Sequence, residues 1–109
     1  MKQYHKLVRD RIPEIIAGCG NRPVYYTLDN TAYLTALEEK LSEETAEYCK
    51  EPSMEEMADI LEVIAAICKA RGFDSAVLQR VQQEKARERG GFERKIFLRE
   101  VLEPGDTGF

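Results

Sequence analysis

Apolar residues recur at helical spacing through the middle of this chain. The positions of one such face are Leu34, Leu37, Leu41, Thr45 and Tyr48. They lie three, four or seven residues apart, as one side of a helix requires. Asp29 or Asn30 comes just before them and is a favoured N-cap residue. The pattern therefore predicts a long helix from about residue 30 to residue 50.

A second helical pattern begins after Pro52. Its apolar positions are Met57, Ile60, Leu61, Ile64 and Cys68. Ser53, followed three residues later by Glu56, has the form of a capping box, and Gly72 is a typical helix terminator. We expect a helix from about 53 to 72. Its stretch 63–68 is apolar on every side, which is typical of a helix buried centrally or in a subunit interface.

Shorter helices are predicted on either side of this pair. Asp10 is expected to cap a helix from about 11 to 19, with Pro13 in its first turn and Gly20 at its end. Asp74 or Ser75 is expected to cap a fourth helix, which runs to about Arg89 and stops at the two glycines that follow.

Two stretches rich in β-branched and aromatic residues, 21–28 and 95–102, predict short strands that would pair with each other. Together with the four helices they predict an all-α four-helix bundle with a minor β-hairpin. A length of 109 residues and the lack of a linker predict one domain, residues 1–109.

The composition of the chain argues against several classes of protein. Hydrophobic residues make up 43% of the chain and charged residues 33%, and no apolar run approaches the roughly 20 residues of a membrane span. Charges spread through the first residues argue against a secretory signal, so we expect a cytoplasmic protein without a membrane partner. Three widely spaced cysteines and the single histidine, His5, suggest neither a disulfide framework nor a zinc site.

Four acidic residues are arranged symmetrically about Pro52. In two antiparallel helices joined there, Glu44 would be level with Asp59, and Glu47 with Glu56. Carboxylates this close repel one another unless a cation lies among them, and such oxygen ligands suit Mg²⁺ or Mn²⁺. The spacing predicts a divalent-metal site. The alternative is a solvated acidic face in which Glu56 only completes the capping box.

The same acids belong to two short motifs. They are EExxE at Glu43–Glu47 and ExxD at Glu56–Asp59. With the opening KLVRDRIPEII, from Lys6 to Ile16, and the closing ERGGFERKIFL, from Glu88 to Leu98, they cover nearly the whole chain. In these segments the sequence resembles the all-α nucleoside triphosphate pyrophosphohydrolases, which include MazG-like proteins and phosphoribosyl-ATP pyrophosphohydrolase.

The resemblance implies Mg²⁺-dependent hydrolysis of a nucleotide between its α and β phosphates, which releases pyrophosphate. The metal ligands it implies are Glu44, Glu47, Glu56 and Asp59. Glu43 would support a ligand or position the attacking water. A homodimer or larger homo-oligomer is also expected, both from the family and from the apolar stretch 63–68.

A triphosphate needs cations beyond the metal, because charge builds on the phosphoryl oxygens and on the leaving pyrophosphate. Lys85 and Arg89 lie four apart on the predicted fourth helix and are the first candidates. The other candidates are Lys6, Arg9, Arg11 and Arg94. The alternative role for each of these is a solvent-exposed salt bridge.

The sequence is also compatible with two other functions. A non-catalytic helical interaction module would use the acidic face to bind a basic partner. A nucleic-acid-binding protein would use the basic residues between 87 and 99, but the net charge of −4 and the interleaved glutamates argue against a nucleic-acid partner.

Overall fold

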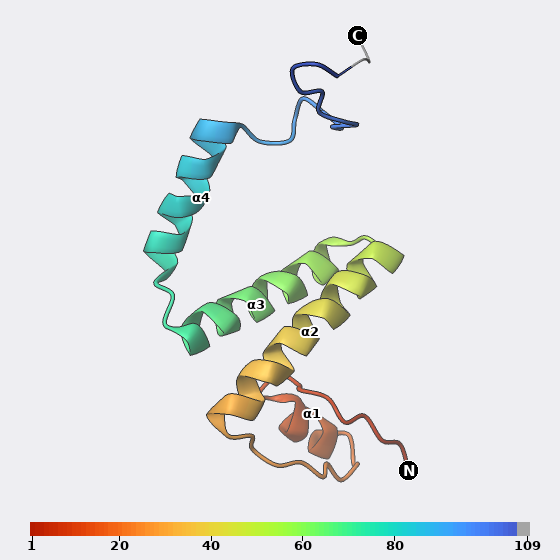
Figure 1. Cartoon of the computed structure of the whole chain (residues 1–109). Helices are drawn as coiled ribbons and strands as arrows, with labels where there is room; N and C mark the ends of the chain where they lie inside the picture. Colours follow the sequence, from red (N-terminus) through yellow and green to blue (C-terminus); the bar gives the residue numbers. More distant parts are fainter. Residues whose placement is uncertain (107–109) are drawn as a thin grey trace. The chain divides into compact units, whose positions relative to one another are not determined.

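The computed structural model describes residues 1–106 and contains four helices in that part of the chain (Figure 1). They are α1 (Ile12–Gly18), α2 (Asn30–Lys50), α3 (Met54–Arg71) and α4 (Ser75–Arg89). The all-α prediction is confirmed, and the predicted helix ends agree with the structure to within about one residue.

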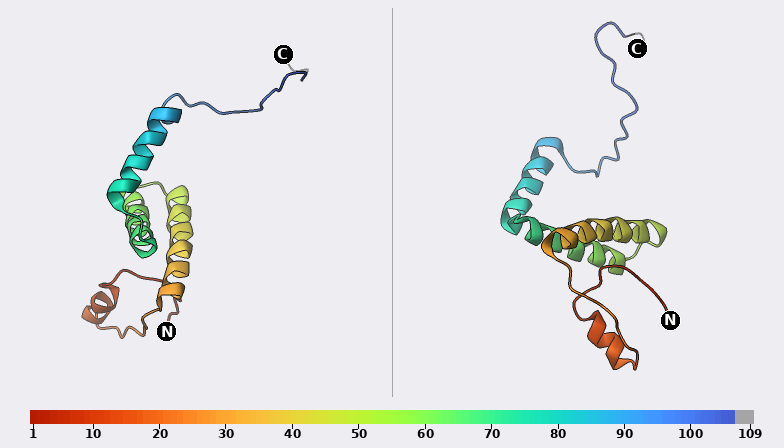
Figure 2. Two further views of the ribbon diagram at one scale, coloured as in Figure 1. Left: turned by 60° about the vertical axis from the view of Figure 1, so that its left-hand side comes forward. Right: turned by 60° about the horizontal axis from the view of Figure 1, so that its bottom comes forward.

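The helices α2 and α3 pack side by side as an antiparallel pair, joined by the short turn 51–53 (Figures 1 and 2). The least exposed apolar residues of the described chain are Leu37 on α2 with Ile60 and Val63 on α3, at 3%, 9% and 8% exposure. All three come from this pair. The α2–α3 hairpin is therefore where the core is made.

Local hydrogen bonds set the ends of these two helices. The side chain of Asp29 accepts a bond from the Ala32 N–H at 2.8 Å, and Ser53 accepts one from the Glu56 N–H at 3.1 Å. Each satisfies an N–H group that has no partner within its own helix. The caps predicted at Asp29 and Ser53 are thus confirmed.

The start of α1 differs from the prediction. Its N-cap is Arg11, which makes no side-chain capping bond, so the predicted cap at Asp10 is wrong. The reason is a turn before the helix, in which the Ile12 N–H donates to the Arg9 carbonyl at 3.0 Å and occupies the position that a cap would use. The expected ending is confirmed, because Gly20 has a φ of 85° just after the helix.

Neither predicted strand is present in residues 1–106, so the minor β-hairpin is wrong. Residues 21–28 form an exposed connection, with Val24 at 90% exposure, and 95–102 is irregular, with Phe97 at 93%. A strand is stable only when its N–H and C=O groups find a partner strand, and an isolated two-stranded hairpin is marginal in water. The β-branched and aromatic side chains of the two stretches favour a strand, but they do not supply the partner strand that a strand needs.

The chain divides into two compact units, Met1–Ser75 and a second that begins at Ala76. The first holds α1 and the α2–α3 hairpin. The second holds nearly all of α4, which has no buried residue. Within the described residues, no helix combines the length and the apolar character that crossing a membrane requires.

The glycine that ends α3 is expected to be sensitive to substitution. Gly72 has a φ of 74°, and the Phe73 N–H donates to the Cys68 carbonyl at 2.8 Å across it. A side chain would meet open space there, so Gly72→Ala should cost only backbone strain, about 1 kcal/mol of unfolding free energy in urea. Gly18→Ala is the control, because Gly18 is helical and equally open. Equal stabilities for the two variants would contradict the strain argument.

Candidate metal centre

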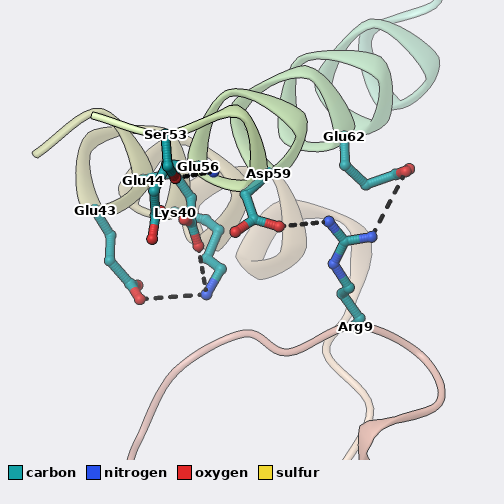
Figure 3. Close-up of polar contacts among 8 residues, drawn as sticks. All are labelled: Arg9, Lys40, Glu43, Glu44, Ser53, Glu56, Asp59 and Glu62. Carbon is teal, nitrogen blue, oxygen red and sulfur yellow. Dashed lines mark hydrogen bonds and ion pairs between the residues drawn. The ribbon is translucent and has the colours of Figure 1, made fainter. Parts of the chain in front are cut away.

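Three carboxylates converge near the turn of the α2–α3 hairpin (Figure 3). Glu44 from α2 and Glu56 and Asp59 from α3 each offer an oxygen atom, and these atoms all lie within 4.8 Å of one another. Because Glu56 and Asp59 are three residues apart, they project from the same face of α3. The antiparallel pairing brings Glu44 level with Asp59, as the sequence predicted.

Glu44 is the least exposed charged residue of the group. Only 9% of its surface is accessible, because its place on α2 is at the edge of the apolar face that packs on α3. A buried carboxylate needs a cation or hydrogen-bond donors to balance its charge. Glu44 has such a neighbour in Lys40, whose Nζ lies 3.3 Å from Glu44 Oε1.

Lys40 connects Glu44 to Glu43, the glutamate next to it in the EExxE motif. Its Nζ also lies 3.3 Å from Glu43 Oε1, and its side chain is only 15% exposed. We did not predict a role for Lys40 from the sequence. Its position three residues before Glu43 and four before Glu44 was the available signal, since residues at these spacings are neighbours on a helix surface.

The segment that precedes α1 supplies two further cations. Arg9 Nη2 donates to Asp59 Oδ1 at 2.7 Å, and Arg9 Nη1 lies 3.8 Å from Glu62 Oε1. Lys6 Nζ lies 3.5 Å from Glu43 Oε1. Two of the cations predicted to bind substrate therefore lie at the acidic cluster.

The other predicted residues lie elsewhere or at the edge of the cluster. Glu47 is exposed and does not belong to the converging group of three. Arg11 pairs with Glu14 within the first turn of α1, at 2.8 Å. The remaining candidates, Lys85, Arg89 and Arg94, belong to the second unit, and their roles remain predictions.

The electrostatics of Glu56 reflect its crowded surroundings. Its pKa is raised above the ordinary value of 4.5, first by desolvation and then by the negative charges of Asp59, Glu44, Glu47 and Glu51. Crowded carboxylates are relieved either by a proton on one of them or by a cation among them. All the converging donors are carboxylate oxygens, the ligand type preferred by Mg²⁺, so these residues fit a hard divalent cation.

Comparisons with known proteins leave the family open. No family model matches the chain, and no solved structure matches it. A 42-residue stretch is 55% identical to part of an uncharacterized protein from Mycolicibacterium smegmatis. The match covers 38% of this chain and 43% of that protein, so the chain aligns with less than half of the relative.

The raised pKa of Glu56 predicts how stability depends on pH without metal. The folded state holds this proton more tightly than the unfolded chain, so the free energy of unfolding should fall as pH rises from about 4.5 through the raised pKa. Glu56→Gln should remove this fall and stabilise the protein above that range. Urea titrations at a series of pH values starting near the ordinary pKa of 4.5 and rising to neutral would measure both effects.

Glu55→Gln is the matched control for this experiment. Glu55 is an exposed glutamate in the same first turn of α3. This variant should keep the pH dependence of the wild type. If it flattens the profile as much as Glu56→Gln does, crowding at Glu56 is not the cause.

Proposed function

We propose that this protein is a Mg²⁺-dependent nucleotide pyrophosphohydrolase of the MazG-like class, acting in the cytoplasm. It would cleave a nucleoside triphosphate or related nucleotide between the α and β phosphates and release a monophosphate and pyrophosphate. The observation that carries the proposal is the convergence of Glu44, Glu56 and Asp59 on one side of the hairpin. These acids belong to the two motifs that carry the family resemblance.

The chain's own residues have clear roles in such a reaction. Glu44, Glu56 and Asp59 would hold Mg²⁺ or Mn²⁺, and the exposed Glu47 would complete the set by turning toward them. The bound metal would polarise a phosphoryl oxygen and acidify water. Glu43 adjoins the cluster and, as a carboxylate, would orient the attacking water or take its proton.

Substrate phosphates also need positive side chains. Lys6 and Arg9 are the best placed of the predicted residues, because Lys6 contacts Glu43 beside the cluster and Arg9 contacts Asp59 within it. A polyphosphate on the metal would lie within reach of such cations and offer them a second anionic partner. We retain Lys85, Arg89 and Arg94 as further proposed phosphate-binding residues.

We also propose that the protein acts as a homodimer or a larger homo-oligomer. On α3, Met54, Met57 and Leu61 are 85%, 39% and 61% exposed, although they belong to a helix of the core hairpin. Apolar side chains spaced three and four apart form one face, and a second copy of the chain would remove that face from water.

Leu61→Glu should weaken this association. A carboxylate on the apolar face would be desolvated without a partner, so the dissociation constant should rise at least about tenfold in analytical ultracentrifugation. Val24→Glu, on the exposed connection before α2, should leave the dissociation constant unchanged. A wild type that is monomeric at all concentrations would contradict the oligomer.

One observation favours a non-catalytic alternative, a helical module that binds a basic partner. Lys6, Arg9 and Lys40 already pair with the acids of the site. Basic side chains of another protein would be bound by the same charges. Such a module would show neither metal-dependent stability nor nucleotide hydrolysis.

The proposed activity is tested by pyrophosphate release from a panel of ordinary and damaged nucleotides, with and without Mg²⁺. Release should require the metal, and Glu44→Gln should lower it by at least about 100-fold because a buried ligand loses its charge. Glu39→Gln, on an exposed position of α2, is the control and should keep wild-type activity. No release from any nucleotide, with no effect of Mg²⁺ on the melting temperature, would favour the interaction module.

A further inference from the structure

The cations at the acidic cluster differ in where they contact it. Lys40 lies on α2 itself, and its ammonium is 3.3 Å from Oε1 of both Glu43 and Glu44. Arg9 comes from the N-terminal segment and bonds one oxygen of Asp59 while also facing Glu62. Figure 3 shows Arg9 and Glu62 on one side of Asp59, and Lys40 with Glu43 on the other.

We propose that Lys40 is a resident counter-ion, whose ammonium group occupies the cation position of the site and leaves it when the divalent metal binds. This inference rests on the proposed function, since it concerns the same metal site. It assigns to Lys40 a role in setting metal affinity, which is separate from the role of a ligand or a catalytic group.

Lys40 and a bound metal would both be neighbours of Glu44. The ammonium is in contact with Glu44 Oε1, and an oxygen of Glu44 lies within 4.8 Å of oxygens from Glu56 and Asp59. A divalent ion bound through Glu44 would therefore share this carboxylate with the ammonium. Two cations on one carboxylate repel each other, and the repulsion is stronger where water is scarce.

Burial strengthens this argument. The side chains of Lys40 and Glu44 are 15% and 12% exposed, so little solvent screens the charges between them. The Arg9–Asp59 pair is more exposed, at 55% and 39%. Lys40 is therefore the cation that a bound metal would displace, because its ion pair is the more buried of the two.

The proposal is tested by measuring the metal affinity of a variant that lacks the positive charge of Lys40. Lys40→Met keeps an unbranched side chain of similar length and removes the charge. Its dissociation constant for Mn²⁺, measured by electron paramagnetic resonance, should be at least about fivefold lower than that of the wild type. Lys69→Met makes the same change of net charge near the far end of α3 and should stay within about twofold of the wild type.

A second measurement uses the wild-type sequence. It therefore does not depend on whether Lys40→Met folds. Acetylation of lysines by acetic anhydride, followed by mass spectrometry, reports how accessible each ammonium group is. Lys40 should react slowly without metal and faster with saturating Mg²⁺, because displacement moves its ammonium to solvent. Lys69, which is exposed and lies on α3, provides the internal reference and should not change.

The outcomes separate this inference from the proposed function. If the wild type binds Mn²⁺ and Lys40→Met binds it equally or more weakly, Lys40 is not the displaced cation, although the metal site stands. Unchanged acetylation of Lys40 in the metal-bound wild type leads to the same conclusion. If Lys40→Met binds Mn²⁺ and the wild type does not, the proposal is confirmed, because the Lys40 ammonium then prevents metal binding altogether. If neither protein binds Mn²⁺, both the inference and the metal-dependent function fail.

Discussion

Packing of α2 against α3 is the interaction on which the described structure depends. Leu37, Ile60 and Val63 provide its best-buried apolar surface, and all three come from these two helices. The same contact fixes the relative height of the acids, because Glu44 and Asp59 lie on helices whose register the turn 51–53 sets. The stability of the fold and the arrangement of the candidate metal ligands therefore both depend on the α2–α3 hairpin. A change in the register of its helices would affect both.

Charge balance is the second constraint. Bringing Glu44, Glu56 and Asp59 together costs free energy, as the raised pKa of Glu56 shows. The structure offsets part of this cost with Lys40 beside Glu44 and Arg9 beside Asp59. Glu56 has no ion pair among the salt bridges of residues 1–106, and the negative charges around it help to raise its pKa. A cation bound there would offset those charges.

The parts of the fold that local rules govern could be predicted from the sequence. Helical periodicity gave α2 and α3, capping chemistry gave Asp29 and Ser53, and antiparallel geometry brought Glu44 level with Asp59. The predicted strands failed because pairing depends on a partner that side-chain preference cannot supply. The Arg9–Asp59 bond joins residues 50 positions apart, so only the path of the N-terminal segment could reveal it.

The short turn between α2 and α3 also bears on how the protein folds. Lys40, Glu44, Glu56 and Asp59 all lie within one hairpin, so their contacts close a loop of fewer than about 20 residues. Contacts this local form quickly, before most long-range packing. Early closure of the hairpin would bring its carboxylates together at the same stage. Because Lys40 belongs to the same segment, its positive charge would already be present there without an ion from solution.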